Sequence, residues 1–138
     1  MPVLKPTLGD LPLLIDMLDD PNPTYREDAA KSLLALGAHA KRAVSALGRL
    51  VVDDPVPGVR EAAIQALSLM GRDAKGALDA LVRAIHDESP SCRRQAVYAL
   101  SRIDAGSRAA ANAVAEAMVD KDEGVRLAAA AVIHRMNR

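Results

Sequence analysis

Aspartate and arginine side chains recur along this sequence at a spacing that could place acids and bases side by side. The series consists of Asp19, Asp53, Asp87 and Asp120 with Arg26, Arg60, Arg93 and Arg126, and the arginines are 34, 33 and 33 residues apart. A catalytic site needs one particular arrangement, whereas a pair that returns in every repeat is what a structural role demands. We therefore interpret the series as structural rather than as a row of catalytic acids and bases.

Cys92 is the only thiol in the sequence, and its setting permits two interpretations. It lies near an expected helix start beside Arg93 and Arg94, a setting that can lower the pKa of a thiol. Its counterparts in the other repeats are Tyr25, Val59 and Val125, which indicate an apolar position between repeats. We favour a packed structural cysteine over a reactive one. A single cysteine also excludes an intramolecular disulfide and fits a reducing compartment.

The three histidines do not form a metal-binding set. No two of His39, His86 and His134 are separated by four residues, and the one cysteine has no histidine close to it in the sequence. The sequence also lacks a Ser-His-Asp order, a glycine-rich phosphate loop and paired carboxylates of the catalytic kind. We expect no cofactor, no metal and no enzymatic activity.

The amino-acid composition indicates which type of secondary structure carries these residues. Half of the 138 residues are hydrophobic, yet there are only two Tyr and no Phe or Trp. Alanine, leucine and methionine favour closely packed helices, whereas a sheet would draw on aromatic and β-branched residues. The sequence therefore predicts an all-α protein.

Charge and hydropathy exclude several classes of partner. Eighteen basic and eighteen acidic residues cancel, so no overall field attracts nucleic acid or an anionic membrane. The first ten residues lack the apolar run of a leader peptide, and no stretch approaches the roughly 20 apolar residues of a membrane span. We expect a cytoplasmic chain that does not associate with membranes.

Each repeat begins with a helix whose start and end are visible in the sequence. Four residues before each Arg stand Asn22, Val56, Ser89 and Asp122, three of which are good N-cap residues, and proline follows in three repeats. Apolar positions follow three and seven residues after the Arg, namely Ala29, Ala63, Ala96, Ala129 and Leu33, Leu67, Leu100, Ile133. A second apolar stripe, starting at Val44, Leu78 and Ala111, predicts a second helix in each repeat.

The stretch "DDPVPGVREAAIQALSLMG", Asp53 to Gly71, resembles a HEAT repeat of the short phycobilin-lyase type. The resemblance lies in the order of Asp, Val-Arg, Ala, Leu and a final Gly, and it extends over roughly residues 10–138. One repeat departs from it, because Asp104 replaces the Gly and Cys92 replaces the Val. The resemblance implies that the Asp and Arg side chains bridge loops between repeats and bind free backbone groups. It also implies that the second helices line a concave surface.

We therefore predict a right-handed α-solenoid of about seven helices in a single domain, residues 1–138. It should contain an unpaired second-type helix at 10–19, repeats at 22–52, 56–86 and 89–119, and an unpaired first-type helix at 122–137. Each helical pair has apolar sides that only a neighbouring repeat can cover.

The solvent side of the second helices is the expected binding surface. Its candidate residues are Lys41, Ser45, Arg49, Lys75, Asp79, Arg83, His86, Arg108, Asn112 and Glu116. Lys41, Lys75 and Arg108 form a basic row that we expect in the first turn of each second helix, where the helix dipole disfavours positive charge by about 0.3–1 kcal/mol. The row is either a solvated charged ridge or a site for an acidic segment or a phosphate.

Small apolar residues among these charges favour a protein partner over nucleic acid, which would require more cations and stacking aromatics. We therefore expect a non-catalytic interaction module that binds a protein or peptide segment. The resemblance implies one alternative, a regulatory or chaperone-like subunit of an enzyme such as a bilin-lyase complex. Binding of an anion or nucleic acid through the basic row is a further alternative.

Two further features suggest contacts outside this surface. The last helix carries Val125, Ala129, Val132, Ile133 and Met136, and we expect this stripe to be uncovered and to mediate homo-oligomerisation or partner docking. Tyr98 occupies a position that is Lys31 and Gln65 in two other repeats, so it is expected to be an exposed contact on the opposite side.

Overall fold

The computed structural model describes residues 7–137, and residues 1–6 and 138 of the expected single domain lie outside this part. All regular elements in 7–137 are helical. The long helices are α2 (Pro23–Leu36), α4 (Pro57–Met70), α6 (Pro90–Asp104) and α8 (Glu123–Met136). The short ones are α1 (Leu11–Met17), α3 (Val44–Asp53), α5 (Leu78–Ala84) and α7 (Arg108–Ala117). Three 3₁₀ helices accompany them, η1 (Leu8–Asp10), η2 (Gly37–Ala43) and η3 (Gly71–Ala77).

The long helices begin where their cap residues predict. The side chains of Asn22, Ser89 and Asp122 accept hydrogen bonds from backbone N–H groups in the first turn of α2, α6 and α8. Val56, at the start of α4, has no such side chain, and its own N–H donates to Asp54 Oδ1 at 2.9 Å. Every long helix therefore starts from a loop that side-chain oxygens hold in place.

Two of the long helices, α2 and α4, end at a glycine. Gly37 and Gly71 have φ of 54° and 58°, in the region that L residues other than glycine seldom adopt, and each is followed by a 3₁₀ turn. Asp104 replaces this glycine in the third repeat. There, α6 is followed by no 3₁₀ helix, and α7 starts at its own cap, Ser107. The substitution therefore changes the connection between the two helices.

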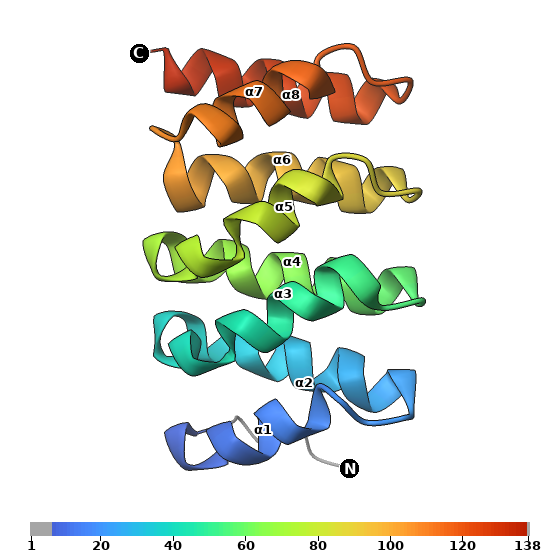
Figure 1. The fold of residues 1–138 in the computed structure, drawn as a ribbon, viewed down its shortest axis with the longest axis vertical. Coiled ribbons are helices and arrows are strands. Elements are labelled where there is room, and N and C mark those ends of the chain that lie inside the picture. Colours follow the sequence, from blue (N-terminus) through green and yellow to red (C-terminus); the bar gives the residue numbers. More distant parts are fainter. Residues whose placement is uncertain (1–6, 138) are drawn as a thin grey trace.

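The eight α-helices of the described part stack in chain order into an elongated solenoid (Figure 1). Each short helix packs mainly on the long helix that follows it, and the long helices pack on one another along their length. The predicted solenoid is confirmed, and its eight α-helices match the expected elements, which add up to eight although we put their number at about seven. Because α1 packs on α2 and α7 on α8, the stack consists of four hairpins, and neither end helix lacks a partner.

The core lies where the apolar periodicity placed it. Leu33, Leu67 and Leu100 are completely buried, as are the alanines three residues after each Arg, whereas Ile133 is half-buried. Alanine occupies much of this core, so helices approach one another closely without aromatic side chains.

The C-terminal helix turns its apolar stripe inward, so the expectation of an uncovered stripe is wrong for most of its residues. Val125, Ala129 and Val132 are completely buried, because they occupy the positions that face the core in α4 and α6. The large apolar side chain that α8 does expose is Leu127, which is 63 % exposed.

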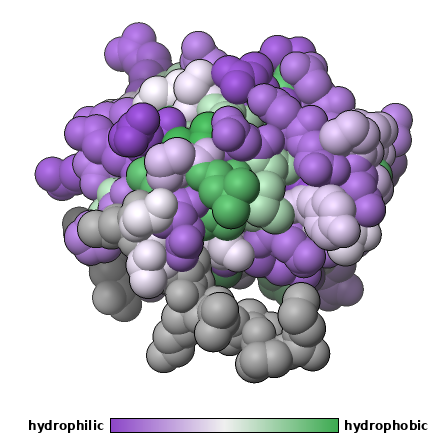
Figure 2. All heavy atoms as spheres, turned by 90° about the horizontal axis from the view of Figure 1, so that it is seen from below, coloured by the Kyte–Doolittle hydropathy of each residue, from purple (hydrophilic) through white to green (hydrophobic). Residues whose placement is uncertain are grey.

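The N-terminal end of the stack combines apolar and polar surface. Figure 2 shows apolar side chains gathered in the middle of this end and hydrophilic ones around them. The exposed apolar and aromatic residues of the first hairpin include Leu13 on α1 and Tyr25 on α2. Asp28, which follows Tyr25 on α2, is also exposed, whereas its counterpart Ala62 on α4 is buried.

Candidate functional site

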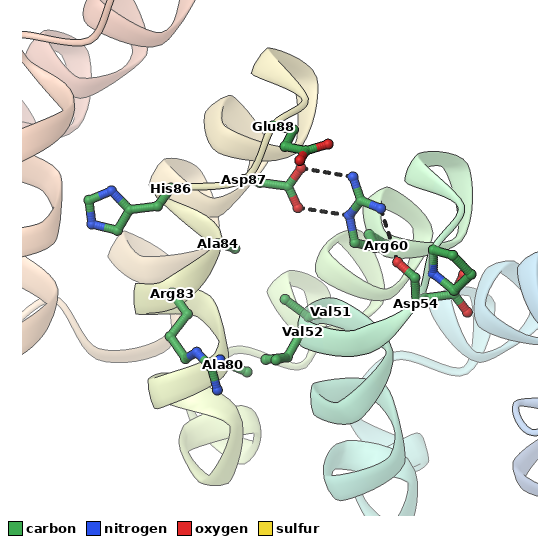
Figure 3. A pocket seen from close by; sticks show the side chains of 11 residues that line it. Val51, Val52, Asp54, Arg60, Ala80, Arg83, Ala84, His86, Asp87 and Glu88 are labelled. Atoms are coloured by element: carbon green, nitrogen blue, oxygen red, sulfur yellow. Dashed lines mark hydrogen bonds and ion pairs between the residues drawn. The ribbon is translucent and has the colours of Figure 1, made fainter.

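The recurrent Asp and Arg side chains form a continuous ladder along the stack. Arg60 donates from Nε and Nη2 to the two carboxylate oxygens of Asp87, at 2.8 and 2.9 Å, and from Nη1 to the carbonyl oxygen of Asp54 at 3.0 Å (Figure 3). One guanidinium thus joins the loop of its own hairpin to the loop of the next. Arg26 and Arg93 make the same contacts with Asp54 and Asp120.

Two aspartates of the series were assigned one residue too early. The ladder uses Asp20 and Asp54 in place of Asp19 and Asp53, because the participating aspartate always lies six residues before the Arg. Asp53, by contrast, is exposed at the end of α3. The interpretation of the series as structural is supported by these bonds.

Each ladder aspartate also organises its own loop. One carboxylate oxygen of Asp54, Asp87 and Asp120 accepts the backbone N–H two residues later, at 2.8–2.9 Å. Although burial alone would raise the pKa of Asp120, hydrogen bonds from the Asp122 N–H and from Arg93 lower it below its ordinary value. Side-chain hydrogen bonds to Asp54 and Asp87 raise the pKa of Arg26 and Arg60, against the opposing effect of desolvation. The shifts at Asp120, Arg26 and Arg60 favour the ionised forms, which hold the loops together.

Cys92 is a packed side chain in this structure. It is completely buried between α4 and α6, and its Sγ lies 3.6 Å from the carbonyl oxygen of Pro57. Burial raises the pKa of the thiol, so the neutral form dominates at neutral pH. The favoured structural role agrees with this setting.

A surface groove lies between α3 and α5. It consists of two adjoining hollows of about 390 and 300 Å³, both lined by Val52, Ala80 and Arg83. We call it the α3–α5 groove. In Figure 3, Val52 and Ala80 approach each other across it, and the Arg60–Asp87 pair closes one end.

Small residues make this groove possible. Gly48 on α3 faces α5 so closely that a Cβ there would lie 3.4 Å from the Ala77 Cβ and 3.8 Å from the Ala80 Cβ. The two repeats therefore meet closely at Gly48, and Val52, one turn further along α3, is half-buried and lines both hollows. The resulting floor is apolar and shallow, and it can take a side chain but not enclose a small molecule.

Charged side chains of both signs surround this floor. One hollow brings together four of the predicted site residues, Ser45, Arg49, Asp79 and Arg83, and adds Asp53, which was assigned to the structural series and not to the binding surface. No ion pair among residues 7–137 involves Arg49, Arg83, Asp53 or Asp79. These groups can therefore pair with a ligand without breaking an ion pair of the described chain, although Arg49 also donates a hydrogen bond from Nη1 to Ser45 Oγ at 3.4 Å.

The other predicted site residues lie apart from the groove floor. All ten candidates are exposed, and Arg108, Asn112 and Glu116 lie on α7. His86 lines the end of the groove, and its Nε2 lies 3.6 Å from Glu116 Oε2. Figure 3 shows its ring pointing away from the groove.

The basic row differs from the prediction. Lys41 and Lys75 lie in the 3₁₀ helices η2 and η3, so only Arg108 occupies the first turn of an α-helix. The dipole argument therefore fails for both lysines. Their Nζ atoms lie 3.9 Å from carboxylate oxygens of Asp73 and Asp104 in the next repeat, which reduces the positive charge they offer to an anion.

The alanines that shape the groove floor were not predicted from the sequence. Ala77 and Ala80 look like ordinary core alanines in a helical pattern, and the distance between two helices of different repeats is not encoded in either helix alone. The glycine at position 48, in the middle of a helix, was the one available signal of close helix approach.

Two global properties complete the description of the site. None of the helices in the described part of the chain combines the length and apolar character needed to cross a membrane. Residues 7–137 contain no group of three or more His, Cys, Asp or Glu side chains that could hold a metal ion.

Solved structures with the same fold include interaction proteins. A designed armadillo repeat protein in complex with the peptide (KR)4 aligns with 94 % of this chain at a TM-score of 0.80 and 22 % identity, and this chain spans 65 % of its length. The complex of CpcE and CpcF of phycocyanin lyase from Nostoc sp. aligns with 92 % of this chain and 99 % of that chain, at a TM-score of 0.63 and 20 % identity.

The Pds5–Scc1 complex aligns with 93 % of this chain and 22 % of that chain, at a TM-score of 0.71 and 15 % identity. Curated protein sequences gave no significant match. The model of HEAT repeats matches residues 7–68 and 68–134, so that each match covers two of the four hairpins. This chain belongs to the HEAT-repeat family.

Proposed function

We propose that this chain is a non-catalytic scaffold that binds an extended segment of a partner protein in the α3–α5 groove. The observation that carries the proposal is the pair of adjoining hollows, whose apolar floor of Val52 and Ala80 is surrounded by side chains of both charges. An apolar side chain of the partner would cover the floor, and its charged neighbours would pair with Arg49, Arg83, Asp53 and Asp79.

The charge of the groove narrows the class of segment. Two cations and two anions line one hollow and Glu88 lines the other, so a segment with both charge signs is favoured over a purely acidic one. The (KR)4 complex of the designed armadillo protein supports peptide binding by a solenoid of this shape, although its peptide is purely basic. The basic row supports no second function, because two of its three cations lie close to carboxylates.

Selection from a random peptide display library tests this proposal, followed by measurement of binding by fluorescence anisotropy. Ala80→Leu fills the floor, and Arg83→Glu reverses one charge, so each should weaken selected peptides by about tenfold or more. Ala109→Leu on α7, where the alanine is exposed, is the matched control and should not change affinity. Equal binding by the wild type and both groove variants would contradict the proposal, as would a library that yields no binder at about 100 µM.

A further inference from the structure

The outer face of the long helices carries a second set of exposed apolar side chains. Leu69 on α4 is 47 % exposed, Tyr98 on α6 is 36 % exposed and Leu127 on α8 is 63 % exposed. Leu69 lies nine residues after the ladder arginine of its helix, Tyr98 five and Leu127 one. From each long helix to the next, the exposed side chain therefore lies about one helical turn nearer to the N-terminus of its helix. The three side chains therefore form a diagonal stripe across α4, α6 and α8, on the layer away from the α3–α5 groove.

The spacing along this stripe can be worked out from helix geometry. One turn of four residues is about 6 Å along a helix, and packed helices lie about 9 Å apart, so neighbouring side chains of the stripe are about 11 Å apart. A partner helix presents residues i and i+7 on one face about 10.5 Å apart. Three apolar residues at heptad spacing on one helix therefore match Leu69, Tyr98 and Leu127.

Arginines flank the stripe. Arg94 and Arg102 lie one turn to either side of Tyr98 on α6, and Arg135 lies two turns beyond Leu127 on α8. The exposed side chains of α6 and α8 include four arginines and only one carboxylate, Glu123. No ion pair among residues 7–137 involves any of these arginines.

A hollow at the ends of α6 and α8 concentrates this charge. It has a volume of about 240 Å³ and is lined by Ser101, Arg102, Ala105, Arg135 and Met136. Arg102 is held in place by a hydrogen bond from its Nε to the carbonyl oxygen of Ser68 at 3.2 Å, in the last turn of α4, which also carries Leu69. Two guanidinium groups at one small hollow suit a carboxylate side chain.

Glu123 lies one turn before Leu127 on α8 and is the exposed carboxylate next to the stripe, whereas the glutamates of α2 and α4 are already engaged. Glu27 on α2 pairs with Lys31 at 3.2 Å, and Glu61 on α4 accepts a hydrogen bond from the Ser91 hydroxyl at 2.8 Å. The surface over α6 and α8 is therefore cationic around an apolar stripe, although the chain as a whole has no net charge. Charge complementarity then selects an acidic partner.

We propose that the Leu69–Tyr98–Leu127 stripe and its flanking arginines bind an acidic amphipathic helix of a partner protein. The apolar residues of that helix lie on the stripe at heptad spacing, and its Glu and Asp residues pair with Arg94, Arg102 and Arg135. The chain then has two separate binding surfaces, one on each helical layer, and this second surface does not depend on the α3–α5 groove.

The test uses a synthetic peptide of three heptads with leucine at every seventh position and Glu or Asp on both sides of it. Fluorescence anisotropy with the full chain measures its affinity, and a peptide with Lys in place of each acid is the charge control. Two variants replace a residue of α6 by the residue at the equivalent position of α4. They are Tyr98→Gln, which copies Gln65, and Arg94→Glu, which copies Glu61. Because the fold already accepts these residues at equivalent positions, both variants should fold, and thermal unfolding followed by circular dichroism verifies this.

We expect each variant to weaken the acidic peptide by about tenfold, and we expect the affinity to fall as salt is raised. Arg49→Glu in the groove is the matched charge control and should change the affinity less than twofold, and Ala80→Leu should leave it unchanged. Equal affinity for the wild type, Tyr98→Gln and Arg94→Glu would overturn the proposal, as would equal binding of the lysine peptide or no binding at about 1 mM.

Two other results would assign the surface differently and overturn the proposal. Loss of peptide binding in Ala80→Leu alone would place the peptide in the groove. A dimer in sedimentation velocity that Tyr98→Gln dissociates would make a second copy of this chain the occupant of the stripe.

Discussion

Replacing Leu67 by alanine tests the packing that holds the hairpins together. Leu67 is completely buried on α4, in the middle of the stack, and α4 packs against both α2 and α6. Removing three carbon atoms loses their transfer free energy and leaves a cavity that helices held on both sides cannot fill. The expected loss in the free energy of unfolding is about 3 kcal/mol.

This loss should appear in both chemical and thermal unfolding. For 138 residues the unfolding entropy is about 0.3 kcal/mol per degree, so a loss of 3 kcal/mol lowers Tm by about 10 °C. Urea unfolding followed by circular dichroism at 222 nm gives the free energy directly, provided that the m-value is the same in both proteins. An unchanged m-value indicates that the four hairpins still unfold together.

Leu69→Ala is the matched control, because Leu69 lies two residues further along the same helix and is 47 % exposed. The same atoms are removed from a side chain that already contacts water, so the loss should be below about 0.5 kcal/mol. The reasoning is refuted if Leu67→Ala costs less than about 1 kcal/mol or if the two variants lose similar amounts.

Three further predictions concern the ladder and the thiol. Arg60→Met should lose about 3 kcal/mol in urea unfolding because it leaves the Asp87 carboxylate unpaired, and the double variant Arg60→Met/Asp87→Leu should recover part of that loss. The pKa of Asp120 is lowered in the folded chain, so its contribution to stability is present above about pH 4 and is lost as the pH falls below that value. The difference in unfolding free energy between the wild type and Asp120→Asn should therefore be smaller at pH 3 than at pH 6; a pH-independent difference would contradict this prediction. Cys92 should react with a thiol reagent only as the chain unfolds, and fast reaction of the folded chain would show that its burial is misassigned.

The repeat pattern predicted the helices well because their starts and ends depend on local chemistry. Asn22, Ser89 and Asp122 cap the helices that follow them, and Gly37 and Gly71 supply the positive φ that ends two of them. The ladder could also have been predicted in full. The series Asp20, Asp54, Asp87 and Asp120 has the same spacing as the arginines, whereas the chosen series with Asp19 and Asp53 does not.

It was harder to predict which side chains are buried on the last helix, α8, and between α3 and α5. Val125 and Ala129 occupy the same offsets as buried residues of α4 and α6, so the pattern itself indicated that they face inward. On α8, Ala130 is exposed, whereas its counterparts Ile64 on α4 and Val97 on α6 are buried. The α3–α5 groove could not be predicted from either helix, because its width depends on how closely Gly48 lets α3 approach α5.

Residues that are the same in every repeat of this chain have a structural role, whereas exposed residues that differ between repeats point to function. A residue that must close the same contact in every hairpin cannot vary, and the ladder arginine and the alanine three residues after it are accordingly the same in all four. A residue that faces water is under no such constraint, so a departure from its neighbours marks a local requirement. Tyr98 stands where other repeats have Lys31 and Gln65, and Arg94 stands where they have Glu27 and Glu61. Both departures fall on α6, one turn apart on its exposed face, and a partner that binds there would account for both, whereas packing of the solenoid accounts for neither.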